Sequence, residues 1–200
     1  MQRVLSEIRI AGYGGQGVIL SAAVIGKAGA IFEGGYACMT QAFGPEARGG
    51  SSSAQVILST EPILYPYVTQ PDVLVVMSQE AYTRFAPQLK PGGILITEQE
   101  MVNIDKMPTG IRVYGVPATR LAEELGRKMV LNIVMVGFFG AVTDLLGREA
   151  LRQAVADSVP PAFQELNLRA FDKGFEYGSQ MLVKLAENGD SVEALSLESA

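Results

Sequence analysis

The stretch AGYGGQGVIL, residues 11–20, places four glycines within six residues. The residues before it, SEIRIA (6–11), alternate between polar and apolar side chains in the manner of a β-strand. The residues after it, VILSAAVIGKAGAIFEGG (18–35), are rich in small apolar side chains and favour a packed helix. A strand, a glycine turn and a helix in this order begin either a nucleotide-binding unit or a close helix-on-sheet contact. Both interpretations predict an α/β protein.

The pattern of strand followed by helix continues beyond this unit. Further strands are predicted at 36–43, 53–60, 72–78, 94–98 and 111–116, and the run DVLVVMS is apolar throughout, as in a buried parallel strand. After residue 117 the pattern is helical, with helices predicted at 132–146, 148–158 and 162–187. The predicted fold is therefore α/β, a Rossmann-like parallel-sheet domain with a helical C-terminal part. We expect a single domain over residues 1–188 and a flexible acidic tail over 189–200.

The composition excludes several classes of function. The net charge is −5 and no basic run is present, so neither nucleic acid nor an anionic membrane surface is an expected partner. The chain has no histidine and one cysteine, Cys38. It therefore has no histidine base, no internal disulfide and no capacity to hold an iron–sulfur cluster alone. We predict no catalytic residue and no metal ligand in this chain.

Location follows from two other features of the sequence. The N-terminal segment MQRVLSEIRI lacks the pattern of a signal peptide, and a cytoplasmic protein is expected. The apolar stretch 129–147 carries Asn132 and Asp144, so its uninterrupted part is short for a membrane span. We predict a buried helix there.

The glycine turn matches the dinucleotide fingerprint GxGxxG at Gly12, Gly14 and Gly17. Its backbone, together with the helix N-terminus that follows, suits a phosphate group. A dinucleotide fold also needs an acid at the end of its second strand. Glu33 precedes that strand, which ends at Phe43 without an acid. The missing acid weakens the interpretation that the turn binds a nicotinamide dinucleotide. Close packing of the helix on the sheet is the alternative role of the glycines.

A second polar loop, FGPEARGG (43–50), interrupts the apolar chain. Loops after successive parallel strands open at one edge of a sheet, so we expect this loop beside the glycine turn. Arg48 is suited to hold an anion in a bidentate manner. A simple surface pair between Glu46 and Arg48 is the equally weighted alternative.

The pair of motifs GYGGQGV (12–18) and FGPEARGG (43–50) resembles the gamma subunit of the 2-oxoacid:ferredoxin oxidoreductases. The segments DVLVVMSQEAY, PGGILITE and NLRAFDKG, together with Asn132, add to the resemblance, which covers roughly residues 5–185. The chain is most similar to the small, separately encoded subunits of the 2-oxoglutarate enzymes. Gamma chains of the pyruvate and branched-chain 2-oxoacid enzymes are similar too, and stay alternatives.

The resemblance implies a place in a larger enzyme of anaerobic metabolism. Such enzymes decarboxylate a 2-oxoacid on thiamine diphosphate, pass electrons through iron–sulfur clusters to ferredoxin and release an acyl-CoA. The implied partners are an alpha (pyrimidine-binding) subunit, a beta (thiamine diphosphate-binding) subunit and a ferredoxin-like delta subunit. Thiamine diphosphate, Mg²⁺ and the clusters belong to those chains, and no cofactor is expected on this chain alone.

For this chain the resemblance implies a rim that faces the partners and helps to accommodate coenzyme A. The implied residues are the glycine turn Gly12, Gly14, Gly15, Gln16 and Gly17, and the second loop Gly44, Pro45, Glu46, Arg48, Gly49 and Gly50. A purely structural role, in which both loops serve only subunit contacts, is one alternative. A stand-alone nucleotide-binding protein of Rossmann-like fold is another.

Overall fold

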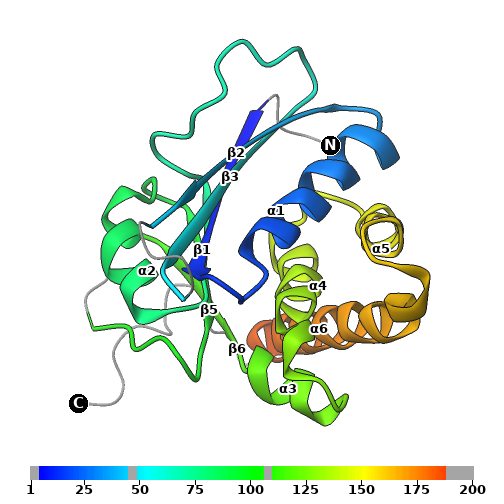
Figure 1. Cartoon of the computed structure of the whole chain (residues 1–200). Coiled ribbons are helices and arrows are strands. Elements are labelled where there is room, and N and C mark those ends of the chain that lie inside the picture. Colours follow the sequence, from blue (N-terminus) through cyan, green and yellow to red (C-terminus); the bar gives the residue numbers. More distant parts are fainter. Residues whose placement is uncertain (1–4, 45–48, 106–109, 188–200) are drawn as a thin grey trace.

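The computed structural model describes residues 5–44, 49–105 and 110–187. Six strands form one sheet in the order β2-β3-β1-β4-β5-β6 (Figure 1). The strands are β1 Leu5–Tyr13, β2 Tyr36–Phe43, β3 Ser51–Ser59, β4 Val73–Val76, β5 Ile94–Glu98 and β6 Arg112–Val116. The α-helices are α1 Val18–Lys27, α2 Gln79–Phe85, α3 Ala118–Glu124, α4 Leu131–Thr143, α5 Arg148–Asp157 and α6 Pro161–Glu187. Three short helical segments extend or precede the α-helices: the π-helix η1 Ala28–Phe32 and the 3₁₀-helices η2 Ala86–Gln88 and η3 Lys128–Val130.

The sheet is mixed, which corrects one part of the predicted fold. Strands β1, β4, β5 and β6 run parallel, but β3 lies antiparallel to both β1 and β2. The α/β class and the helical C-terminal part are confirmed, whereas a wholly parallel sheet is wrong at β3. The reason is the connection: residues 44–50 join β2 to β3, and a parallel crossover needs a dozen residues or more.

The helices cover the two faces of the sheet unequally. Helices α1 and α4 lie against one face, while α2 lies against the other (Figure 1). Strands β4 and β5 sit between these layers and are buried at every position, which explains their continuous apolar sequence. In α4, every residue from 131 to 140 is buried, because α6 covers the side that faces away from the sheet. The stretch 129–147 is thus a core helix, as predicted.

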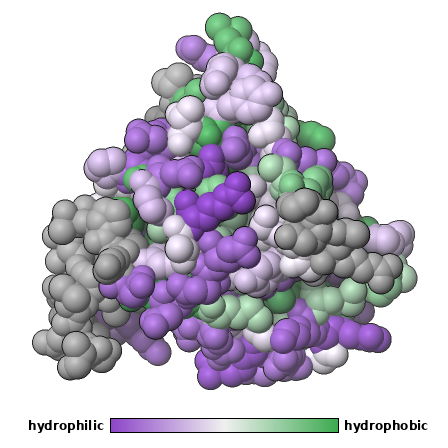
Figure 2. Space-filling model, turned by 60° about the vertical axis from the view of Figure 1, so that its left-hand side comes forward, coloured by the Kyte–Doolittle hydropathy of each residue, from purple (hydrophilic) through white to green (hydrophobic). Residues whose placement is uncertain are grey.

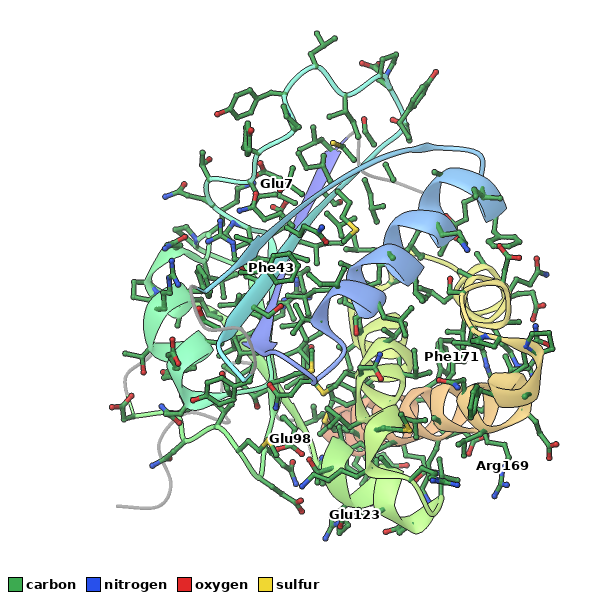
Figure 3. All side chains as sticks on the ribbon, in the orientation of Figure 1. Glu7, Phe43, Glu98, Glu123, Arg169 and Phe171 are labelled. Carbon is green, nitrogen blue, oxygen red and sulfur yellow. The ribbon has the colours of Figure 1, made fainter. Side chains whose placement is uncertain are left out.

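Glycines allow α4 and α6 to approach closely. A Cβ built on Gly137 would lie 2.1 Å from the Phe171 carbonyl oxygen, and one built on Gly174 would lie 2.0 Å from that of Val134. Neither position has room for any side chain. Phe171 itself is fully buried between the C-terminal helices (Figure 3). The long amphipathic helix predicted from the sequence is therefore held to the core by backbone contact.

One charged side chain is completely buried at the end of β5. Glu98, labelled in Figure 3, accepts hydrogen bonds from the backbone N–H groups of Thr119 (3.0 Å) and Glu100 (2.9 Å). These bonds supply partners for the carboxylate and cap the first turn of α3. Glu98 therefore has a structural role in joining β5 to α3.

The surface in Figure 2 is mainly hydrophilic, with small apolar areas. The apolar atoms at its top belong to the connection between β3 and β4, which forms the top of Figure 1. That connection exposes Leu64, Tyr65 and Tyr67.

Cys38, on the edge strand β2, is half-buried. Among the described residues, no helix is both long and apolar enough to cross a membrane.

Candidate functional site

The two glycine loops lie side by side at the carboxyl edge of the sheet. The N–H of Gly14 donates a 2.8 Å hydrogen bond to the carbonyl oxygen of Gly50, and that of Gly44 donates to Ser51 at 2.7 Å. A Cβ on Gly14 would lie 3.4 Å from the nitrogen of Gly49. The two loops therefore lie beside one another as predicted, although not because they follow successive parallel strands. Because β2 and β3 form a hairpin, the hairpin loop reaches the end of β1.

Gln16 holds the glycine turn in shape. Its side-chain oxygen accepts from the N–H of Tyr13 at 2.6 Å, and its amide nitrogen donates to the Met77 carbonyl oxygen at 2.8 Å. A Cβ on Gly12 would lie 2.5 Å from the Gln16 side-chain oxygen. The side chain thus fills the space above Gly12 and joins the ends of β1 and β4. In this structure it braces the turn rather than projecting from it.

We expect Gln16→Leu to lower the free energy of unfolding by about 1–3 kcal/mol, because the buried Met77 carbonyl loses its donor. Gln79→Leu is the control, since the Gln79 side chain makes two hydrogen bonds to the backbone of Asn103 but is exposed. That control should cost less than about 1 kcal/mol. Urea denaturation of the two variants measures both values. Equal losses would show that Gln16 is no brace.

Gly17 begins helix α1 in a left-handed conformation, with φ of 74°. A Cβ there would lie 2.5 Å from Cγ of Asn132, whose amide nitrogen lies 3.4 Å from the Gly17 carbonyl oxygen. Asn132 is only 3% exposed. The asparagine in the apolar helix α4 therefore secures the start of α1.

Two other glycines, one in each loop, are open. Gly15 (φ 96°) and Gly49 (φ 72°) have left-handed backbones, and a Cβ at either would meet nothing within 4 Å. Backbone of this kind lets a ligand or another chain approach closely. The start of α1, with its positive dipole end, follows directly. The edge thus offers exposed peptide groups suited to an anion or to a partner's surface.

A small cavity of about 190 Å³ lies behind the loops. It is bounded by the hairpin end (Phe43, Ser51–Ser53) and by Glu80 and Arg84 of α2. The Arg84 guanidinium lies 5.1 Å from the centre of the Phe85 ring. Glu80 and Arg84 could not be recognised as site residues from the sequence, because their position beside the hairpin depends on how α2 packs. Their i, i+4 spacing was the available signal, because it places both side chains on the same side of a helix.

Three predicted site residues lie outside the described residues: Pro45, Glu46 and Arg48. The structure places the others, Gly12, Gly14, Gly15, Gln16, Gly17, Gly44, Gly49 and Gly50, at one edge. Glu33, the acid considered for a ribose, instead accepts a hydrogen bond from Gly147 at the start of α5. Among the described residues, no cluster of three or more Cys, Asp or Glu is arranged to hold a metal.

The arrangement differs from a dinucleotide-binding Rossmann domain. In such a domain the strand beside β1 is parallel and ends in the ribose-binding acid. Here that position holds the antiparallel strand β3, which starts at this edge with serines. The fold and site thus define an α/β domain that presents a glycine turn beside a hairpin loop.

The chain belongs to the pyruvate ferredoxin/flavodoxin oxidoreductase family, whose profile matches residues 7–177. It is 41% identical to the 2-oxoglutarate synthase subunit KorC of Methanocaldococcus jannaschii, over 90% of this chain and 97% of that subunit. Its fold is similar to the gamma subunit of a keto/oxoacid ferredoxin oxidoreductase from Geobacter sulfurreducens, with a TM-score of 0.78, 38% identity and coverage of 87% and 96%.

A second similar structure is the 2-oxoglutarate:ferredoxin oxidoreductase of Magnetococcus marinus with 2-oxoglutarate, coenzyme A and succinyl-CoA bound. The TM-score is 0.76 and the identity 26%, over 90% of this chain and 32% of the other. The domain described here therefore corresponds to one part of a longer chain in that enzyme.

Proposed function

We propose that this chain is the gamma subunit of a 2-oxoglutarate:ferredoxin oxidoreductase. The complex would convert 2-oxoglutarate, coenzyme A and oxidised ferredoxin into succinyl-CoA, CO₂ and reduced ferredoxin. The observation that carries the proposal is the 41% identity to a 2-oxoglutarate synthase subunit over almost the full length of both chains. Chains of ketoisovalerate and pyruvate enzymes are less similar to this one, and their substrates are the alternatives.

The chemistry of the chain supports a division of labour within the complex. With no histidine and one cysteine, this chain lacks the ligands of an iron–sulfur cluster. We assign the clusters to a ferredoxin-like delta subunit, and thiamine diphosphate with Mg²⁺ to alpha and beta subunits. These groups supply decarboxylation and electron transfer when bound. The gamma chain contributes structure and one wall of the coenzyme site.

That wall, in our proposal, is the carboxyl edge with its two loops. Coenzyme A carries phosphates, which exposed backbone N–H groups and a helix N-terminus favour. The open positions Gly15 and Gly49 leave room for close approach, and the start of α1 lies next to them. Arg48 adds a cation suited to phosphate. If the loops instead contact only other subunits, they serve assembly alone.

Purification from the source cells under anaerobic, nondenaturing conditions tests the assignment. We expect the chain to copurify with thiamine-binding and iron–sulfur subunits, and the complex to reduce ferredoxin with 2-oxoglutarate and coenzyme A. Pyruvate and 2-oxoisovalerate should give rates lower by at least about tenfold, a discrimination of about 1.4 kcal/mol. If pyruvate or 2-oxoisovalerate were turned over faster, that acid would replace 2-oxoglutarate as the assigned substrate. A chain that arrives alone with a bound nucleotide would contradict the proposal.

In that complex, Arg48→Ala should raise the KM for coenzyme A about tenfold or more, since a charge-assisted hydrogen bond contributes about 1.5–3 kcal/mol. The KM for 2-oxoglutarate should stay unchanged. Arg169→Ala is the control, because Arg169 is exposed on α6 and lies away from the glycine turn (Figure 3). An unchanged KM for coenzyme A in Arg48→Ala would make the loop a subunit contact.

A further inference from the structure

The connection between β3 and β4, residues 60–72, is much longer than the positions of its ends require (Figure 1). Strand β3 runs antiparallel to β1, and β4 runs parallel to β1 on its other side, so β3 ends and β4 begins at the same edge of the sheet. Two strand spacings, about 10 Å, separate these ends, and about four to six residues would join them. The chain uses thirteen, with no helix or strand among them. A connection of this kind usually has a function.

The middle of this connection, residues 62–67, is an apolar arm that projects from the surface. Leu64 is 95% exposed, Tyr65 63% and Tyr67 56%, and the centres of the two tyrosine rings are 5.6 Å apart. Glu61 is the only charged residue between positions 60 and 71. The arm supplies the apolar atoms at the top of Figure 2. A contiguous exposed apolar patch is typical of a surface that binds another protein.

A buried arginine holds the base of the arm. The backbone N–H of Val68 donates to the Gln55 side-chain oxygen at 2.8 Å, and its carbonyl oxygen accepts from the Arg9 guanidinium at 2.9 Å. Arg9 is only 5% exposed, and its guanidinium lies 4.8 Å from the centre of the Phe85 ring. Burying a charged group is costly unless it is hydrogen-bonded. The contact with Val68 therefore fixes the arm to the sheet beneath it.

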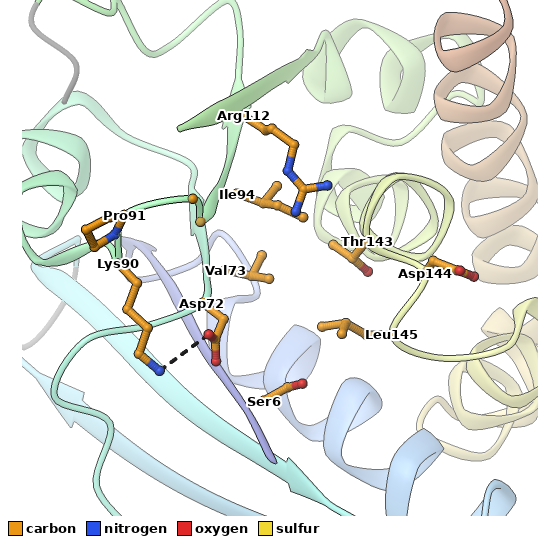
Figure 4. A pocket seen from close by; sticks show the side chains of 12 residues that line it. Ser6, Asp72, Val73, Lys90, Pro91, Ile94, Arg112, Thr143, Asp144 and Leu145 are labelled. Carbon is orange, nitrogen blue, oxygen red and sulfur yellow. Dashed lines mark hydrogen bonds and ion pairs between the residues drawn. The ribbon is translucent and has the colours of Figure 1, made fainter. Parts of the chain in front are cut away.

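Both ends of the connection are fixed as well. At its start, the N–H of Glu61 donates to the Ser59 hydroxyl at 3.0 Å. At its end, the Lys90 ammonium lies 3.4 Å from a carboxylate oxygen of Asp72 (Figure 4). Three prolines restrict the backbone further: Pro62, Pro66 and Pro71. The arm thus has its shape before a partner arrives, which lowers the entropy cost of binding.

The arm lies at the edge of the sheet opposite to the two glycine loops. Leu5 and Tyr36 both pair with Ser59, where the connection starts, whereas Tyr13 pairs with Ser51 beside the glycine loops. Leu5 is 45% exposed and Tyr36 47%, so both add apolar surface at the arm's edge. The proposed coenzyme site uses the other edge and leaves this one available.

The longer relatives indicate which protein covers the arm. This domain matches 32% of the Magnetococcus marinus chain and 36% of a ketoisovalerate oxidoreductase subunit from Methanothermobacter thermautotrophicus. In those proteins about two-thirds of the polypeptide is joined covalently to the domain. A covalent link keeps two domains together at high effective concentration. Where the remainder is a separate subunit, surface contacts alone must hold it.

We propose that the arm anchors this chain to the subunit that corresponds to the remainder of those longer chains. Leu64, Tyr65 and Tyr67 enter an apolar groove on that subunit, with the tyrosines as the main contacts, since tyrosine is enriched among residues that dominate binding energy. The inference rests on the proposed function, because the partner is another subunit of the same enzyme. It assigns assembly to one edge of the sheet and the coenzyme to the other.

Coexpression with the other subunits, with an affinity tag on the partner subunit, tests the arm. Leu64→Ser/Tyr65→Ser/Tyr67→Ser should lower the recovery of this chain at least about tenfold, and Leu64→Arg alone should raise the Kd for the partner by a similar factor. The Leu64 side chain is 95% exposed, so Leu64→Arg should leave the urea denaturation of the isolated chain unchanged. Phe163→Ser on α6 is the control, because Phe163 is also exposed (52%), and its recovery should be complete.

The outcomes separate the arm from the proposed function. Full recovery of both arm variants, beside a normal complex of the unaltered chain, would overturn the arm alone, as would an equal loss in Phe163→Ser. Failure of the unaltered chain to bind any other subunit would overturn the proposed function and the arm together. If the isolated chain is a dimer that Leu64→Arg converts to a monomer, the arm binds a second copy and the proposal is wrong. With the partner in excess, the KM for coenzyme A should be unchanged in Leu64→Arg, and a raised KM would contradict the division between the two edges.

Discussion

Replacing Gly174 by alanine should remove much of the stability of this fold. The new Cβ would lie 2.0 Å from the Val134 carbonyl oxygen and 3.1 Å from the Phe138 nitrogen, both in the backbone of α4. Backbone atoms in a buried helix have no alternative rotamer, so α4 and α6 would have to separate. We expect a loss of about 3–5 kcal/mol, at the upper end for overpacking, out of a typical 5–15 kcal/mol.

The reciprocal change Gly137→Ala should have a similar effect, since its Cβ would lie 2.1 Å from the Phe171 carbonyl oxygen. Gly26→Ala in α1 is the control. There the nearest atoms, in Ala37 and Val56, are 3.8 Å away, and alanine favours a helix by up to about 1 kcal/mol over glycine. Urea denaturation followed by circular dichroism measures all three. Near-native stability of Gly174→Ala would show that the helices do not cross here.

The elements that the sequence predicted well are those whose signal is local. The apolar runs that became β4 and β5 are buried on both faces, and the amphipathic period over 162–187 became α6. The direction of β3, in contrast, has no local signal in the sequence. Strand alternation within 53–60 is the same in either orientation, and only the shortness of the 44–50 connection distinguishes a hairpin from a crossover.

The candidate site shows the same limit. The glycine turn and its neighbour loop were predictable from spacing, but the partners that fix them were not. Met77 and Asn132 lie 61 and 115 residues from Gln16 and Gly17 respectively, and their contacts depend on tertiary packing. Buried Glu98 looked like an ordinary strand end, because its partners at Thr119 and Glu100 appear only after folding.

Gly17→Ala is the second change with a large expected effect. It combines two costs: roughly 1–2 kcal/mol for an alanine at φ 74°, and roughly 1–3 kcal/mol for contact of its Cβ with Asn132, whose Cγ would be 2.5 Å away. We expect a total near 3 kcal/mol in urea denaturation. Gly15→Ala isolates the first cost, because its φ is 96° but its Cβ would meet nothing within 4 Å.

A double-mutant cycle isolates the second cost. Asn132→Ala alone should lose about 1 kcal/mol, since the buried amide no longer reaches the Gly17 carbonyl. In Gly17→Ala/Asn132→Ala the new methyl group has space, so the pair should be more stable than the sum of the single losses by about 1–3 kcal/mol. The double variant would then resemble Gly15→Ala in stability, because backbone strain is the main cost left. Simple additivity would mean that Asn132 does not restrict residue 17, and the start of α1 would depend on the glycine's backbone alone.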